Sequence, residues 1–223
     1  MNAANLQLSP EEMRLVSDPG WILTKNSVMG KAVGVMGELA GRYREVWGDS
    51  HGGLGGIGPG DPKVSRGENY RGLPWVMLDY PRVFGREDVL AIRTMFWWGH
   101  SFSVTLHLKG TYQALYLPVI RGRRLELAAA GFHVGIHEDE WRHEHTREVF
   151  RPMDETFLAE ATGGGAIGGS DVKGEAAIGG GDAVFGRGAF FKLSAAVGLD
   201  RWAAAPDLLT GLFQTLVGVL RES

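Results

Sequence analysis

The sequence contains no cysteine among its 223 residues. Disulfides, cysteine-ligated zinc, iron–sulfur clusters and a thiol nucleophile are therefore excluded. No apolar run reaches about 18 residues, so we expect no membrane-spanning segment. The N-terminal residues MNAANLQLSPEEM do not place an apolar stretch after a basic one, so we expect no signal peptide either. These absences together favour a soluble, cytoplasmic protein.

The charged residues show little excess of either sign, with 23 Lys and Arg against 26 Asp and Glu. Binding to nucleic acid needs a concentrated positive field, and this chain has a net charge of −3. We therefore do not favour a nucleic-acid partner. The 44% of hydrophobic residues is ordinary for a globular protein and sufficient for a core. We expect a single domain over residues 1–223.

Glycine is abundant, with 34 residues, about twice the typical share of roughly 7%. It is concentrated in residues 48–62 and 162–188. Glycine-rich chain loses much conformational entropy on ordering and buries few side chains. Both segments are therefore predicted to be loops.

Three segments have the features of helices. The first begins at Ser9-Pro10-Glu11-Glu12, which supplies an N-cap, a proline at the first position and acids in the first turn, and it ends near residues 18–20. The second is predicted from about Asn26 or Ser27 to Trp47, where apolar residues recur at helical spacing. Its glycines are unfavourable in a helix, and we expect them to admit another element closely: Gly30, Gly34, Gly37 and Gly41. The third, from about Pro206, has a wide apolar stripe.

The strand predictions cover residues 73–81, 87–98, 101–109, 131–137 and 189–194. Residues 101–109 alternate between apolar and polar side chains, which is typical of a strand with one buried face. Residues 111–130 are predicted to be helical in part, with Pro118 as an interruption. Strands that lie between terminal helices, without regular βαβ alternation, indicate an α+β fold with a largely antiparallel sheet.

Four of the seven histidines fall within residues 131–145. A hairpin that pairs 131–137 with 141–149 would place these odd-numbered histidines on one face. His133, His143 and His145 could then bind a divalent metal, with Glu138 or Glu144 as a base in a metal-dependent enzyme. Two alternatives remain open, because no His-Glu-x-x-His spacing is present: a pH-sensitive patch, or a polar surface without chemistry.

Aromatic residues crowd into residues 75–98 beside several polar groups. A pocket lined by aromatic rings with a few converging polar side chains is typical of a small-molecule site. An arginine in a buried strand should be paired, so Arg93 is expected to contact Asp79, Glu68 or an anionic ligand. The candidate ligand-binding residues are Arg66, Arg82, Arg93, Trp97, Trp98 and His100. The other interpretation is that these rings only form the core.

The segments GENYRGLPWVMLDYP (67–81) and IRTMFWWGHSFSVTLHLKG (92–110) resemble an uncharacterised family of small bacterial proteins whose members have no assigned activity. The resemblance covers about the middle third of the chain, with the last strand and helix as a further part, and it implies a bacterial, intracellular protein. It supplies no catalytic or binding residues, and it does not include the two glycine-rich segments.

The sequence leaves the question of enzymatic activity open, since it contains neither a Gly-x-Ser-x-Gly elbow nor a phosphate-binding loop. The first hypothesis is a binding module for a small molecule or a protein, with no cofactor predicted. The second is the metal-dependent enzyme described above. The third is a homo-oligomer formed through the C-terminal helix.

Overall fold

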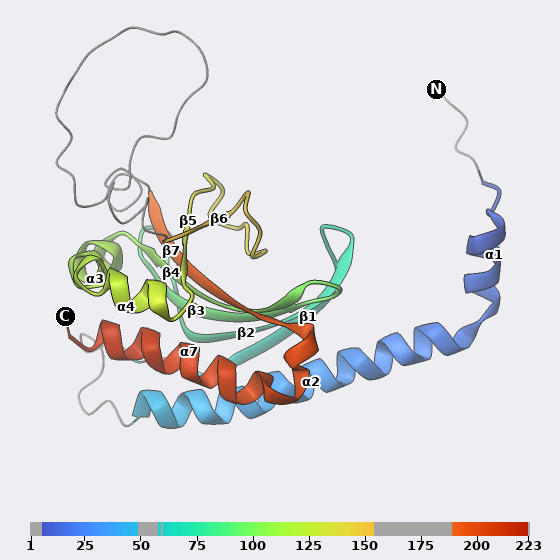
Figure 1. The fold of residues 1–223 in the computed structure, drawn as a ribbon, viewed down its shortest axis with the longest axis horizontal. Helices are drawn as coiled ribbons and strands as arrows, with labels where there is room; N and C mark the ends of the chain where they lie inside the picture. Colours follow the sequence, from blue (N-terminus) through green and yellow to red (C-terminus); the bar gives the residue numbers. More distant parts are fainter. Residues whose placement is uncertain (1–5, 49–57, 59, 154–188, 223) are drawn as a thin grey trace, which may run out of the picture.

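The computed structural model describes residues 6–48, 58, 60–153 and 189–222. Within this part of the chain, one sheet contains seven strands: β1 (Lys63–Tyr70), β2 (Leu73–Phe84), β3 (Val89–Trp97), β4 (Ser101–Lys109), β5 (His133–Gly135), β6 (Phe150–Pro152) and β7 (Phe190–Gly198). The sheet is antiparallel, and its strand order is β1-β2-β3-β4-β7-β5-β6. Helices near both ends of the chain lie along one face of the sheet (Figure 1). The predicted α+β class, with a largely antiparallel sheet packed against N-terminal and C-terminal helices, is therefore confirmed.

Most of the predicted strands are present in the structure. The predictions at 73–81, 87–98, 101–109 and 189–194 are confirmed, although the first strand continues to Phe84 and the last to Gly198. Strands β1 and β6 were not predicted, and in β1 glycine and charged residues conceal the alternation.

The predicted hairpin of residues 131–137 with 141–149 is wrong. The strand β5 is short and pairs with β6, so that His133 lies opposite Pro152 rather than His145. Its other edge pairs with β7, where His133 lies opposite Ser194. The residues between β5 and β6 are turns and irregular chain. They lie over the sheet because their polar groups bond to it, as described below.

The helices are α1 (Pro10–Ser17), α2 (Pro19–Gly48), α3 (Thr111–Gly122), α4 (Arg124–Ala129), the 3-10 helix η2 (Leu199–Ala204) and α7 (Ala205–Leu220). Helix α1 begins with Ser9 as its N-cap, as predicted, and Ser9 and Glu12 also form a capping box. Helix α2 begins at Pro19, earlier than predicted, because the residues that end α1 also begin α2. Pro118 lies inside α3 and does not interrupt it.

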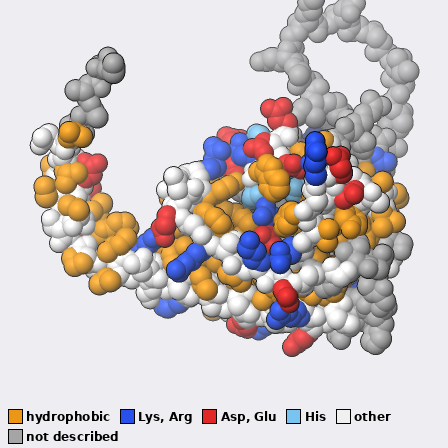
Figure 2. All heavy atoms as spheres, turned by 180° about the vertical axis from the view of Figure 1, so that it is seen from behind, with side chains coloured by type: hydrophobic (Ala, Val, Ile, Leu, Met, Phe, Trp, Pro, Cys, Tyr) orange, Lys and Arg blue, Asp and Glu red, His pale blue; other side chains and the backbone are white. Residues whose placement is uncertain are grey.

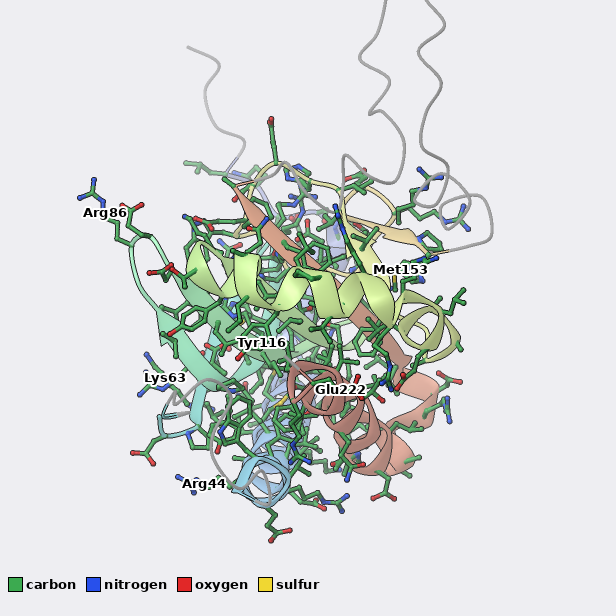
Figure 3. The ribbon with its side chains drawn as sticks, turned by 90° about the vertical axis from the view of Figure 1, so that its left-hand side faces the viewer. Arg44, Lys63, Arg86, Tyr116, Met153 and Glu222 are labelled. Carbon is green, nitrogen blue, oxygen red and sulfur yellow. The ribbon has the colours of Figure 1, made fainter. Side chains whose placement is uncertain are left out.

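The core lies between the sheet and helices α2 and α7. Even-numbered side chains of β3 and β4 point into it, and α2 contributes a buried stripe at helical spacing: Met29, Ala32, Met36, Leu39, Tyr43 and Trp47. Tyr116 of α3 and Met153 also belong to this core (Figure 3). Arg44 and Arg86 extend into solvent in the same view.

The last helical stretch, Leu199–Leu220, is long and apolar enough to cross a membrane. In the structure the apolar residues of α7 pack against α2 and the sheet, which accounts for their hydrophobicity: Leu209, Phe213, Leu216, Val217, Val219 and Leu220 are all buried. The homo-oligomer through this helix stays a prediction. The apolar stripe on which that prediction relied packs against α2 and the sheet of the same chain.

The glycine-rich segment 162–188 lies outside the described residues, as does most of 48–62. The loop predictions there stay predictions. The glycines inside α2 are described, and the expectation that they admit another element closely is wrong. A Cβ atom added at any of the four would meet nothing within 4 Å.

Candidate functional site

The face of the sheet opposite the helices carries a row of polar residues from neighbouring strands. Asp79 lies opposite Arg93, Arg93 opposite Thr105, and Thr105 opposite Ser194. His107 and Lys192 form a second opposed pair beside this row. We call these six residues the polar face. Most are nearly inaccessible to water, with His107 at 0% and Lys192 at 2% exposure.

Residues 136–149, here named the covering segment, lie over the polar face and account for this burial. His143 places its Nε2 atom 2.6 Å from Nη1 of Arg93. Lys192 donates from its ammonium nitrogen to the backbone carbonyls of Glu140, at 3.1 Å, and of Arg142. His145 lies 3.1 Å from the hydroxyl of Ser194 through its Nδ1 atom. Groups from two strands therefore hold the covering segment in place.

The middle of the covering segment is also fixed by Tyr70, at the end of β1. The backbone N–H of His143 donates to the Tyr70 hydroxyl at 2.8 Å, and that hydroxyl donates to Glu144. Burial, together with the bond to Glu144, raises the pKa of Tyr70 to about 12. Burial alone would raise the pKa of Glu144, but hydrogen bonds from Tyr70 and Arg142 bring it below its ordinary value.

Under the covering segment, burial changes the acid–base behaviour of several groups. It lowers the pKa of His107 to about 3, and the neighbouring charges of Lys192, Arg93 and Lys109 act in the same direction. It also lowers the pKa of Lys192 to about 7. Both ring nitrogens of His107 lack a hydrogen-bond partner among the described residues, and the closest carboxylate oxygen, on Glu140, is 3.5 Å from its Nε2 atom. Neutral His107 is therefore the form that the structure favours.

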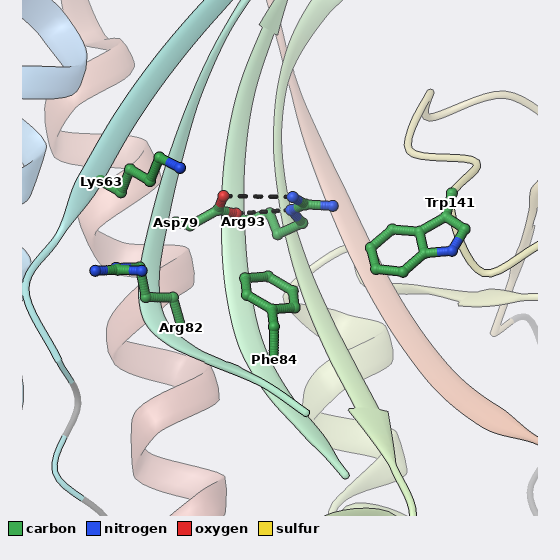
Figure 4. A pocket seen from close by; sticks show the side chains of 6 residues that line it. All are labelled: Lys63, Asp79, Arg82, Phe84, Arg93 and Trp141. Carbon is green, nitrogen blue, oxygen red and sulfur yellow. Dashed lines mark hydrogen bonds and ion pairs between the residues drawn. The ribbon is translucent and has the colours of Figure 1, made fainter. Parts of the chain in front are cut away.

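A pocket of about 210 Å³ opens where the polar face meets the covering segment (Figure 4). Its lining consists of Lys63, Asp79, Arg82, Phe84, Arg93 and Trp141. The rings of Phe84 and Trp141 are 6.5 Å apart between centroids, and the Arg93 guanidinium lies 5.2 Å from the Phe84 centroid. The pocket thus combines two aromatic walls with three cationic side chains and one carboxylate.

Asp79 and Arg93 form an ion pair at the base of this pocket. The Arg93 Nε atom donates to Asp79 Oδ1 at 2.6 Å, and its Nη2 atom donates to Oδ2 at 3.3 Å. A guanidinium has five N–H groups. Two of them bond to Asp79 and a third points to His143, which leaves two to donate elsewhere. The expectation that Arg93 contacts Asp79 is correct.

The structure brings together only two of the six residues predicted to bind a ligand. Arg82 and Arg93 line the pocket. Arg66 is exposed and pairs in register with Val76, whose side chain faces the helices, so it lies on the opposite face of the sheet.

The other three predicted ligand-binding residues lie away from the pocket. Trp97 packs with Met77 and Met95 and stacks on His100, with the two ring centroids 3.6 Å apart. Trp98 packs against the core on the helix side.

The histidines predicted to bind a metal are divided between two places. The rings of His133 and His145 are 4.6 Å apart, and burial lowers the pKa of both. His143 instead faces Arg93, whose positive charge opposes a metal cation at that nitrogen. The described residues contain no group of three or more side chains placed to hold a metal ion. The metal site stays a prediction without geometric support in this part of the chain.

Four residues of the pocket were not predicted to bind a ligand: Lys63, Asp79, Phe84 and Trp141. Lys63 and Asp79 lie opposite each other on β1 and β2, a pairing that could have been inferred only by predicting β1. Trp141 reaches the pocket from a distant, irregular segment, which leaves no periodic signal in the sequence.

The chain matches no family model, and neither curated proteins nor solved structures include one that is significantly similar to it. The resemblance to an uncharacterised bacterial family therefore stays a prediction, as do the bacterial origin and the cytoplasmic location that it implies.

Proposed function

We propose that the protein binds a small anionic molecule carrying a flat ring in the pocket between β1, β2, β3 and the covering segment. The observation that carries this proposal is the charge balance of the lining. Lys63, Arg82 and Arg93 supply three positive charges, whereas Asp79 supplies one negative charge. An anion would bring the lining closer to neutrality, and a partly enclosed site strengthens such an interaction relative to bulk water.

The guanidinium groups determine how the anion would be held. Arg82 donates from Nε to the backbone carbonyl of Asp61 at 2.7 Å, which fixes its stem and leaves the outer N–H groups for a ligand. Two N–H groups of Arg93 remain as well. Planar guanidinium groups suit carboxylate or phosphate oxygens, which accept two parallel hydrogen bonds.

The aromatic walls suggest the rest of the ligand. Phe84 and Trp141 are exposed at the surface, at 41% and 51%, and come from distant parts of the chain. A flat ring placed against both would cover apolar surface that water now contacts, and aromatic contacts of this kind add to area burial. A pocket of about 210 Å³ limits such a ligand to one ring with a short acidic substituent.

The test uses four probes with the purified full-length chain: benzoate, phenyl phosphate, inorganic phosphate and neutral benzyl alcohol. Titration calorimetry should detect saturable binding of benzoate or phenyl phosphate, weaker binding of phosphate and none of benzyl alcohol. Arg82→Gln should weaken binding about tenfold or more, since a hydrogen bond to a charged group contributes about 1.5–3 kcal/mol.

The matched control is Arg66→Gln, which removes the same charge from the opposite face of the sheet. It should leave the affinity unchanged within about twofold, given the screening of exposed charges by salt. Equal losses in the two variants would show a diffuse charge effect and overturn the proposed site. So would the absence of saturable binding by any anionic probe.

A further inference from the structure

Beside the pocket, the polar face contains a histidine whose hydrogen-bonding groups are not used. His107 has 0% exposure, and neither of its ring nitrogens has a partner among the described residues. A buried polar group normally forms hydrogen bonds, and leaving one without a partner is costly. Two atoms of the covering segment also lack partners in this part of the chain, Oε2 of Glu140 and Nδ1 of His143. A polar group of a ligand would satisfy atoms of this kind.

The register of the sheet aligns His107 with the pocket. Arg82, which lines the pocket, lies opposite Ala91, and Ala91 lies opposite His107. Neighbouring strands are about 4.8 Å apart, so the backbones of Arg82 and His107 are separated by about 10 Å. Between them the sheet contributes only the methyl group of Ala91. Figure 2 shows basic, hydrophobic and histidine side chains close together near the centre of one face of the molecule.

The side chain of Trp141 lies between the pocket and His107. Its ring lines the pocket, at the end opposite Arg82 (Figure 4), and its centroid is 6.0 Å from that of the His107 ring. The Trp141 side chain forms no hydrogen bond with the described residues, and Trp141 is 51% exposed. Its backbone is held in place, because its N–H donates to the Asp139 carboxylate at 2.8 Å and Lys192 binds the carbonyls on either side. The ring can therefore turn aside while the covering segment stays in position.

The surroundings of His107 favour an uncharged partner. Burial and three neighbouring positive charges lower the pKa of His107 to about 3, so its ring is neutral near neutral pH. The charges belong to Lys192, Arg93 and Lys109. A neutral imidazole has one N–H donor and one acceptor nitrogen. A hydroxyl group both donates and accepts, so it matches His107 in either tautomer, whereas a cationic group would be repelled by the three positive charges.

We propose that the pocket has a second subsite behind Trp141, in which His107 recognises an uncharged hydroxyl group on the ring of the bound anion. Trp141 is the gate to this subsite. The acidic group lies with Arg82 and the ring crosses Ala91, so that the acid and the hydroxyl stand at opposite ends of one ring. The ligand class is an aromatic acid with a para-hydroxyl group. This inference rests on the proposed binding of an aromatic anion in the pocket.

The first experiment compares para-substituted benzoates on the purified full-length chain by titration calorimetry. 4-Methylbenzoate has a substituent of similar size to a hydroxyl group but forms no hydrogen bond through it. 4-Hydroxybenzoate should bind about threefold to tenfold more tightly than 4-methylbenzoate, the gain expected of one neutral hydrogen bond. 4-(Aminomethyl)benzoate carries a cation at the same position and should bind more weakly than benzoate.

The variant that tests His107 is His107→Phe, which keeps an aromatic ring and removes both nitrogens. Its readout is the ratio of the affinities for 4-hydroxybenzoate and 4-methylbenzoate, because a general disturbance of the pocket weakens both ligands alike. The preference for the hydroxyl group should be lost. The matched control is His100→Phe, at an exposed position where the ring stacks on Trp97 outside the pocket, and it should keep the preference.

Nuclear magnetic resonance of protein with ¹⁵N-labelled histidine observes the contact directly. The ring resonances of His107 are identified by their absence from His107→Phe. They should shift when 4-hydroxybenzoate is added and change much less with 4-methylbenzoate, because only the hydroxyl group forms a hydrogen bond with the ring.

The outcomes separate the subsite from the pocket. Saturable binding of benzoate with equal affinities for the hydroxyl and methyl ligands would overturn the subsite and leave the pocket intact. A preference for the hydroxyl group that survives His107→Phe would assign its recognition to another residue and would also overturn the subsite. If none of the aromatic acids binds, the pocket and the subsite are both wrong.

Discussion

The guanidinium of Arg93 lies between the carboxylate of Asp79 on β2 and the ring of His143 in the covering segment. Arg93, in the middle of the sheet, therefore links its ion pair with Asp79 to the covering segment. Arg93 and Asp79 have side-chain exposures of 13% and 8%, so water screens their interaction only weakly.

We expect Asp79→Ala to lower the free energy of unfolding by about 3 kcal/mol, because it leaves a nearly buried guanidinium without its counter-charge. Urea denaturation followed by circular dichroism measures this change. The control is Asp207→Ala, which removes an 80% exposed carboxylate from its ion pair with Arg42. That substitution should change stability by less than about 1 kcal/mol. Equal effects would contradict the importance assigned to the buried pair.

Stability should fall as the pH decreases below about 6.5. Burial lowers the pKa of His107 to about 3 and of His145 to about 4, and it also lowers that of His143. These histidines therefore bind protons near pH 6.5 in the unfolded chain, but only at much lower pH in the folded chain. The free energy of unfolding decreases over the pH range between the two. Each histidine contributes at most about 1.4 kcal/mol per pH unit in this window.

Urea titrations at pH 7.5, 6 and 5 measure this slope. His145→Asn should reduce it, because the variant lacks one of the histidines whose pKa burial lowers. A slope that is the same in the wild type and in His145→Asn would contradict the assignment.

Lys192→Met should loosen the covering segment without unfolding the sheet. The variant loses the two hydrogen bonds to the carbonyls of Glu140 and Arg142 but keeps an apolar stem of similar length. Hydrogen exchange followed by mass spectrometry should show faster exchange in peptides spanning residues 138–146, with peptides from α7 unchanged. Lys31→Met, at an exposed position of α2, is the control and should alter neither region. Unchanged exchange at 138–146 would contradict the role of Lys192.

Substituting glycine by alanine should have opposite effects at two positions. Gly37→Ala in α2 should raise stability by up to about 1 kcal/mol, since the new Cβ meets nothing within 4 Å and alanine favours helix. Gly67→Ala in β1 should lower it by about 1–3 kcal/mol, because the Cβ would lie 2.6 Å from the Trp75 indole nitrogen. Thermal unfolding of the two variants measures both changes. Equal shifts would contradict this description of the sheet edge.

The sequence predicts the central hairpin well because local rules govern it. Residues 101–109 alternate strictly, and Gly99-His100 supplies the turn between β3 and β4. The pairing of Arg93 with a carboxylate also follows from the cost of an unpaired buried charge.

Positions determined by distant contacts are the ones that the sequence does not predict. The covering segment adopts no regular structure, and Lys192, from the other end of the chain, fixes its place. Trp141 enters the pocket because it belongs to the covering segment, whose position depends on these distant contacts. The predicted register of the histidines was wrong because the prediction paired residues 131–137 with 141–149 in a local hairpin. In the structure β5 pairs with β6 and β7 instead.

The strand β7 lies between β4 and β5, although it follows both in the sequence. During translation, β4 and β5 are therefore synthesised before β7, the strand that joins them in the sheet. Until then β4 presents an open hydrogen-bonding edge, which is a site where nascent chains associate wrongly. Efficient production of this protein in a cell should accordingly depend on factors that shield the emerging chain until β7 can pair with β4 and β5.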